Sequence, residues 1–247
     1  RVARFLGWCA AERQDFTAAT TEVFDRWQRW LAVERRNGAS YRAQQVAAVR
    51  NFYDWRRSRG LADQHLAADV RGPRIKPKPA RKYTDDQLRG LFRSVAQSPG
   101  ERQRRDKAIL LLFLAAGLRR EEMARLSMSS LELSRRRGVV HVEGKGAKER
   151  QVPFEGPVVE ALTDWLQERE SLPYPVDPDA LWVSTTGGTR GERLSIDGLE
   201  GLLKAHAQRA KLRNWGIHRF RVTFATQLYD DGADIETIRA LMGHESI

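Results

Sequence analysis

The spacing of apolar residues predicts that residues 1–70 fold as helices. Val23, Trp27 and Leu31 recur at helical spacing, and Thr20 or Thr21 can cap the helix that carries them. We expect the tryptophans of this region to belong to its core. The first residues of the chain have the character of a helix interior, so we interpret residues 1–70 as a helical N-terminal domain that is truncated at its start.

The next helix of this region combines an apolar face with many arginines. It is expected to open near Ser40 and to end at Gly60. Long cations on a rigid helix are well placed to follow a DNA backbone. Arg42 and Arg50 are therefore candidates for phosphate contacts.

Residues 71–83 differ in character from the segments on either side. Three prolines prevent a regular helix and favour an extended chain. The stretch has six basic residues and no acid, and we interpret it as an interdomain linker that crosses a phosphate backbone rather than as a plain spacer. Its basic residues are Arg71, Arg74, Lys76, Lys78, Arg81 and Lys82.

Residues 84–247 form the second predicted domain, which opens with a capping box at Thr84 and Gln87. The expected fold class is mainly α with a small antiparallel β-sheet, that is, a helical N-terminal domain followed by a mixed α+β domain. Helices are predicted at 84–98, 101–116, 156–170, 195–210, 216–230 and 234–242, and strands at 139–142 and 150–153 around a glycine-rich turn.

Composition narrows the class of partner. Lys and Arg number 43 and Asp and Glu 32, which gives a formal charge of +11. A protein with such an excess of positive charge usually binds a polyanion, most often nucleic acid. The alternative is that the basic residues form a solvated surface without a partner. The single cysteine, Cys9, excludes an intramolecular disulfide, and we expect it in the core of a cytoplasmic protein. No apolar run approaches the length of a membrane span.

Two segments of the second domain offer cations at exposed turns. In the first, Arg119 follows the helix-breaking Gly117, and Glu122 lies one helical turn further on, where its carboxylate can orient the guanidinium. In the second, Lys145 stands at the tip of the predicted hairpin, within a run that lacks P-loop spacing. Taken alone, the first pattern is equally compatible with ordinary surface charge, and for the second pattern an ordinary exposed lysine is the favoured interpretation.

Two later segments add histidines and another arginine. His218 and Arg221 are three residues apart on a predicted helix and so share a face. His244 follows Gly243, which is expected to end the last helix. The whole set suits a phosphate that passes through a five-coordinate state, because fixed cations stabilise the developing charge and a Lys or His can donate a proton. No acidic metal cage accompanies it, so we expect no metal or other cofactor.

Together these segments resemble the active-site boxes of the tyrosine recombinase (lambda-integrase-like) family, and most of all its Xer-type and phage or integron integrase members. The resemblance covers nearly the whole chain. It rests on Gly-Leu-Arg-x-x-Glu, Gly-Lys-Gly-x-Lys-x-Arg-x-Val-Pro, His-x-x-Arg and Leu-x-Gly-His, in that order.

The resemblance implies a role for each residue. Arg119 and Arg221 would bind the non-bridging oxygens of the scissile phosphate, and Glu122 would support the site. Lys145 would protonate the 5′-oxygen leaving group, His218 would assist proton transfer with the nucleophile, and His244 would hydrogen-bond the phosphate. Arg120 is assigned to the surface or to DNA.

The resemblance also implies a nucleophilic tyrosine about nine residues beyond His244, at about position 253, whereas the chain ends at Ile247. Tyr229 is expected to be a core residue. We therefore expect this chain to bind DNA without forming the covalent intermediate in cis, and the tyrosine to act in cis or in trans in the longer protein.

The family further implies double-stranded DNA as the partner, a dimer or tetramer on paired sites, and in some members a partner recombinase or accessory factor. The reaction would be strand cleavage and rejoining through a 3′-phosphotyrosine. The alternatives are a DNA-binding regulator of the same fold that does not cleave, and a type IB topoisomerase.

Overall fold

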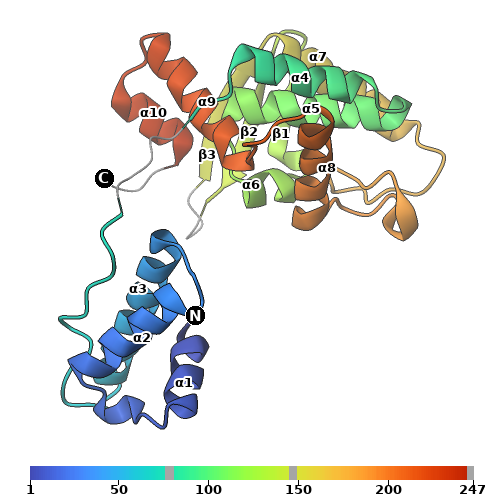
Figure 1. Ribbon diagram of the computed structural model, residues 1–247. Helices are drawn as coiled ribbons and strands as arrows, with labels where there is room; N and C mark the ends of the chain where they lie inside the picture. Colours follow the sequence, from blue (N-terminus) through green and yellow to red (C-terminus); the bar gives the residue numbers. More distant parts are fainter. Residues whose placement is uncertain (76–80, 145–148, 244–247) are drawn as a thin grey trace. The chain divides into compact units, whose positions relative to one another are not determined.

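The chain divides into two compact units in the computed structural model, Arg1–Pro79 and Ala80–Ile247 (Figure 1). The structure describes residues 1–75, 81–144 and 149–243. The division falls within the stretch interpreted as a linker. None of the described helices is long and apolar enough to cross a membrane.

The first unit consists of three helices around an aromatic core. They are α1 (Val2–Ala11), α2 (Thr21–Val33) and α3 (Ala39–Ser58), with a short 3-10 turn at Phe16–Ala18. The ring of Phe5 packs edge-on against Trp27 at 5.0 Å between centroids and lies 6.3 Å from Tyr53. Cys9 is buried beside them, as the sequence predicted.

The tryptophan prediction was wrong for Trp55, whose side chain is 49% exposed. Trp55 follows the buried Tyr53 by two positions on α3, and residues two apart on a helix point to different faces. Its ring stacks on that of Phe52 at 6.2 Å instead of entering the core.

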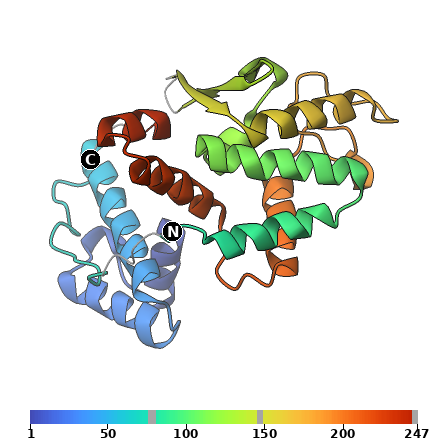
Figure 2. The same cartoon turned by 90° about the horizontal axis from the view of Figure 1, so that it is seen from above.

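The second unit is built around α5 (Gly100–Ala116), which packs against both α4 (Asp85–Ala96) and α7 (Pro157–Glu170) (Figure 1). Figure 2 shows α5 between these two helices. Apolar side chains surround α5 on most of its faces, and Ile109, Leu112 and Phe113 are fully buried. The helices α8 (Ile196–Arg209), α9 (Ile217–Asp230) and α10 (Ile235–Met242) follow, close to their predicted ranges. Asp234 caps α10 by accepting a hydrogen bond from Thr237 N.

A three-stranded antiparallel sheet completes this unit, in the order β1 (Leu131–Leu133), β2 (Arg137–Glu143), β3 (Glu149–Glu155). Val140 of β2 pairs with Val152 of β3, and both are buried. The predicted fold class, mainly α with a small antiparallel sheet, is confirmed. Neither β1 nor the bounds of the short helix α6 (Arg120–Arg125) were predicted, because elements of this length show no clear periodicity in the sequence.

Buried charges join α4, α5 and α8. The carboxylate of Asp106 lies between Arg105, at 2.8 Å, and His206, at 2.9 Å. The other ring nitrogen of His206 lies 2.9 Å from Ser94 Oγ. Buried charges are tolerated when they are paired and hydrogen-bonded, so this cluster fixes how the three helices meet.

The expectation that Tyr229 belongs to the core was wrong. It lies in the last turn of α9 and is 63% exposed. The helix buries Phe220 and Phe224, and Tyr229 is five residues past Phe224, which turns it away from that face.

Gly117 ends α5 in the left-handed conformation, with φ +55°. A Cβ atom at this position would lie 2.3 Å from the Phe224 ring. The absence of a side chain therefore allows α9 to approach the end of α5, directly before Arg119.

Gly117→Ala is expected to destabilise the second unit by about 2–4 kcal/mol, because it adds both backbone strain and a steric clash. Gly201→Ala is the matched control, because Gly201 is an exposed position of α8 and a Cβ atom there would meet nothing within 4 Å. The control should stabilise the chain by about 0.5–1 kcal/mol. Thermal unfolding of the two variants measures both, and equal effects would contradict the packing argument.

Candidate functional site

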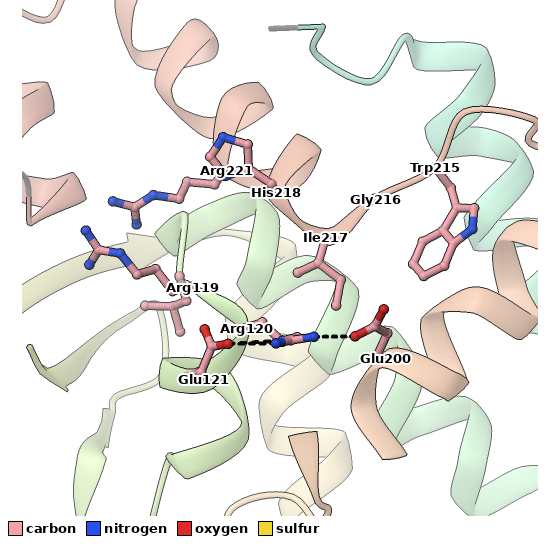
Figure 3. A pocket seen from close by; sticks show the side chains of 10 residues that line it. Arg119, Arg120, Glu121, Glu200, Trp215, Gly216, Ile217, His218 and Arg221 are labelled. Carbon is pink, nitrogen blue, oxygen red and sulfur yellow. Dashed lines mark hydrogen bonds and ion pairs between the residues drawn. The ribbon is translucent and has the colours of Figure 1, made fainter. Parts of the chain in front are cut away.

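Three of the predicted site residues meet at one cavity of the second unit, whose volume is about 570 Å³ (Figure 3). Arg119 lies at the N-terminus of α6, and His218 and Arg221 lie on the first turns of α9. Trp215 and Ile217 supply apolar lining from the segment that leads into α9. On its other side Arg119 borders a second cavity, of about 1140 Å³, between α6, β2, β3 and α10.

Glu122 is the buried centre of the site, with a side chain only 7% exposed. Its carboxylate accepts hydrogen bonds from the backbone N–H of Arg119 at 2.8 Å and from Arg119 Nη1 at 2.7 Å. The contact with the guanidinium is the one its spacing suggested. Because Glu122 is the third residue of α6, the same carboxylate also caps the helix on which it stands.

Arg150 is a second partner of Glu122 and was given no role in the sequence analysis. From β3 it donates to both carboxylate oxygens, at 3.1 and 2.7 Å, and its Nε donates to Leu241 O at 2.9 Å. Its side chain is 11% exposed. Arg150 thus joins β3, α6 and the end of α10. The only indication of a role for Arg150 in the sequence was its place in the Lys-x-Arg-x-Val-Pro segment.

Arg221 is 2% exposed and joins three parts of the unit. Its Nη1 donates to Gly117 O at 2.6 Å, and its Nη2 donates to Met242 O. Arg119 Nη2 donates to Gly243 O at 3.0 Å. The two guanidinium groups therefore hold the end of α10 in place, and Figure 3 shows them facing the same space.

The electrostatics of this cluster favour an anion. Burial raises the pKa of Glu122, but hydrogen bonds from Arg150 and Arg119 outweigh it and lower the pKa to about 2. Burial, together with repulsion by Arg119, lowers the pKa of Arg221 to about 10. Two guanidinium groups, those of Arg119 and Arg150, pair with the one carboxylate, and Arg221 adds a third guanidinium group beside Arg119 at the cavity. Positive charge that is fixed in this way is suited to a phosphate group.

Arg120, assigned from the sequence to the surface or to DNA, is engaged within the protein. It pairs with Glu121 at 2.9 Å and with Glu200 of α8 (Figure 3). These three side chains lie at the same cavity as Arg119 and His218. Arg120 is therefore neutralised beside the site.

The remaining predicted residues are spread over both units. Lys145, His244, Lys76 and Lys78 lie outside the described residues. In the first unit, Arg50, Arg71 and Arg74 are exposed and Arg42 is half-buried. In the second, Arg81 and Lys82 are exposed, and Lys82 pairs with Asp230 at 2.9 Å. Within residues 1–75, 81–144 and 149–243, no three His, Cys, Asp or Glu side chains are grouped to hold a metal ion.

Glu122→Gln is expected to make the chain less stable at neutral pH. The folded-state pKa of Glu122 lies below its ordinary value of 4.5, so its stabilisation is complete above about pH 4.5 and is lost as the pH falls toward 2. The loss in the variant should be on the order of 3 kcal/mol, because one unit of pKa corresponds to about 1.4 kcal/mol.

Unfolding measured from pH 2 to 7 checks this prediction. In Glu122→Gln, the free energy of unfolding should fall less between pH 4.5 and 2 than in the unsubstituted chain, because the contribution of Glu122 is absent. Glu121→Gln, at a neighbouring side chain that is 47% exposed, is the control and should cost under about 1 kcal/mol. Equal losses in the two variants would show that burial of Glu122 does not matter.

The chain is similar to proteins of a known family. Residues 81–247 match the model of the phage integrase family. Tyrosine recombinase XerC of Corynebacterium glutamicum is 34% identical over 226 residues, which cover 89% of this chain and 70% of that protein.

Two solved structures share the fold. The XerH site-specific recombinase, in a pre-cleavage complex with its difH substrate, superposes with a TM-score of 0.72 at 20% identity, over 94% of this chain and 66% of that chain. A lambda integrase dimer bound to a COC′ core site gives 0.70 at 16% identity, over 99% and 87%. Because the family model covers more than half of the chain and the XerC sequence aligns along most of it, the chain belongs to the phage integrase family of tyrosine recombinases.

Proposed function

We propose that this chain is the DNA-binding and catalytic body of a site-specific recombinase that cleaves and rejoins DNA strands through a 3′-phosphotyrosine. The observation that carries the proposal is the pair Arg119 and Arg221, which meet at one cavity and are held there by Glu122 and by the end of α10. Storage of the phosphodiester energy in a covalent bond would make an external energy source unnecessary.

The proposed reaction assigns a task to each side of the phosphate. Arg119 and Arg221 bind its non-bridging oxygens and stabilise the charge of the five-coordinate state. His218, exposed at the same cavity, assists the proton transfer of the nucleophile. Lys145 protonates the 5′-oxygen that leaves, and His244 donates a hydrogen bond to the phosphate. The nucleophile is a tyrosine at about position 253 of the longer protein.

We further propose a division of labour along the chain. Residues 1–70 bind DNA through Arg42 and Arg50, residues 71–83 follow the phosphate backbone, and residues 84–247 carry the chemistry. The linker contacts are Arg71, Arg74, Lys76, Lys78, Arg81 and Lys82, whose charge favours a polyanion.

The partners proposed are double-stranded DNA and further copies of the chain, in the cytoplasm. The lambda integrase structures include a dimer on a core site and a tetramer on a Holliday junction. The same fold, at TM-scores of about 0.7, supports a similar assembly of this protein on paired sites.

Covalent capture tests the proposed reaction. The chain and a version extended by its natural C-terminal residues are each mixed with fragmented DNA of the source organism, and protein–DNA adducts that resist SDS are isolated. The extended chain alone should form adducts, on a 3′ phosphate, and sequencing of the trapped DNA identifies the site. Salt-sensitive binding without adducts would instead favour the regulator.

His218→Ala in the extended protein should slow adduct formation roughly a hundredfold, because it removes a proton-transfer group, while DNA affinity changes little. His141→Ala is the control: His141 lies on β2, is 30% exposed and pairs with Glu132 at 2.7 Å. A timed adduct assay at saturating DNA measures both rates. An unchanged rate for His218→Ala would remove this residue from the proposed mechanism.

A further inference from the structure

Tyr83, at the start of the second unit, is hydrogen-bonded to Gly216, the residue directly before α9. Its side chain is buried, with the residue only 2% exposed. The hydroxyl accepts a hydrogen bond from Gly216 N–H at 3.0 Å and donates one to Gly216 O at 3.1 Å. One hydroxyl thus bonds to both backbone groups of the residue that precedes Ile217, where α9 begins, and the carbonyl of Gly216 also accepts from the backbone N–H of Arg219 at 3.0 Å.

The backbone of Tyr83 makes a second connection to the same helix. Its N–H donates to Thr223 Oγ1 at 2.8 Å, and Thr223 Oγ1 in turn donates to Arg219 O at 2.8 Å. Thr223 is 1% exposed, so this pair of hydrogen bonds is shielded from water. Tyr83 therefore holds α9 at its start and again near its middle.

Arg219 adds a third connection in the opposite direction, from α9 to the segment around Tyr83. Its guanidinium lies over the Tyr83 ring, 4.1 Å from the centroid. It donates to Lys82 O at 2.9 Å and to Gln87 Oε1 at 2.8 Å. Arg219 does not line the cavity that His218 and Arg221 line, and its guanidinium is engaged in these contacts.

The held helix is the one that presents His218 and Arg221. Gly216 is two residues before His218 and five before Arg221, and a Cβ atom at Gly216 would meet nothing within 4 Å. Side-chain packing therefore does not fix the backbone at this point, which borders the cavity. The hydroxyl of Tyr83 supplies hydrogen bonds in its place.

We propose that Tyr83 is a positioning residue, which fixes the N-terminal end of α9 and thereby places His218 and Arg221 against the scissile phosphate. The proposal rests on the proposed function of that site. Since Tyr83 directly follows the basic segment 71–82, a backbone contact made by Arg81 or Lys82 with DNA would bear on the same helix. A misplacement of about 1 Å at a reacting group is sufficient to slow a reaction roughly a hundredfold.

Tyr83→Phe is the decisive variant, because it removes only the hydroxyl and keeps the ring that packs at 4.8 Å from Phe220. Tyr229→Phe is the matched control: it makes the same change on α9, at a tyrosine that is 63% exposed. The first readout uses the 247-residue chain and is independent of catalysis. Hydrogen–deuterium exchange should become faster at 214–219 in Tyr83→Phe, stay unchanged in α5, and be unaffected in Tyr229→Phe.

The second readout uses the extended protein with its target DNA. Tyr83→Phe should reduce the single-turnover rate of adduct formation roughly tenfold to a hundredfold, with the DNA dissociation constant unchanged. A purely structural role would instead lower the melting temperature and the DNA affinity together. Thr223→Val removes the hydrogen bond from Tyr83 N–H to Thr223 Oγ1 and should also slow adduct formation at unchanged DNA affinity. This variant replaces Tyr83→Phe in the test if Tyr83→Phe does not fold.

The outcomes separate the two proposals. Absence of adducts with the unsubstituted extended protein would contradict the proposed function itself. Normal adduct formation by both the unsubstituted protein and Tyr83→Phe would overturn the positioning role of Tyr83 and leave the function intact. Faster hydrogen–deuterium exchange at 214–219 in Tyr83→Phe, together with slower adduct formation at unchanged DNA affinity, would establish the positioning role of Tyr83.

Discussion

The site depends on one buried carboxylate that two arginines share. A carboxylate at 7% exposure is costly unless it is paired and hydrogen-bonded, and Glu122 meets this condition through Arg119 and Arg150. Each partner comes from a different element, so the ion pairs place α6 and β3 relative to each other. The arginines also donate to the carbonyls of Leu241 and Gly243, which adds the end of α10. The positions of Arg119 and Arg150 are therefore set by their pairing with Glu122, and Arg221 is held by the carbonyls of Gly117 and Met242.

The same principle organises the unit a second time, away from the cavity. Asp106 is buried between Arg105 and His206 and joins helices that carry none of the proposed catalytic groups. The difference lies in the balance of charge. Asp106 has one arginine and one histidine as partners. Glu122 has two arginines as partners, and Arg221 lies at the same cavity as Arg119, so positive charge remains there. The first arrangement stabilises packing, and the second also prepares a site for an anion.

Much of the architecture could be predicted because long elements carry strong periodic signals and clear ends. The Thr84 capping box, Gly117 and Asp234 each mark a boundary that the structure has. Elements of three to six residues, such as β1 and α6, carry too few residues for a period to show. The side on which a residue lies was also difficult to predict, as Trp55 and Tyr229 demonstrate, because a tyrosine or tryptophan is compatible with either face of a helix.

For the site, sequence spacing indicated local pairs and missed distant ones. Arg119 and Glu122 are one helical turn apart, so their contact could be inferred, as could the shared face of His218 and Arg221. The contact between Arg150 and Glu122 spans 28 residues, and that between Tyr83 and Gly216 spans 133. Such contacts are created by tertiary packing, and a single sequence contains no local pattern that reveals them.

The proposed function requires that Arg119 and Arg221 form a phosphate site that Glu122 holds in place. A crystal structure of the chain bound to a duplex that contains its target site tests it most directly. We expect one DNA phosphate within about 3.2 Å of both guanidinium groups, with Glu122 still paired to Arg119 and Arg150. A phosphate bound elsewhere, or an Arg119 that leaves Glu122 to reach the DNA, would contradict it.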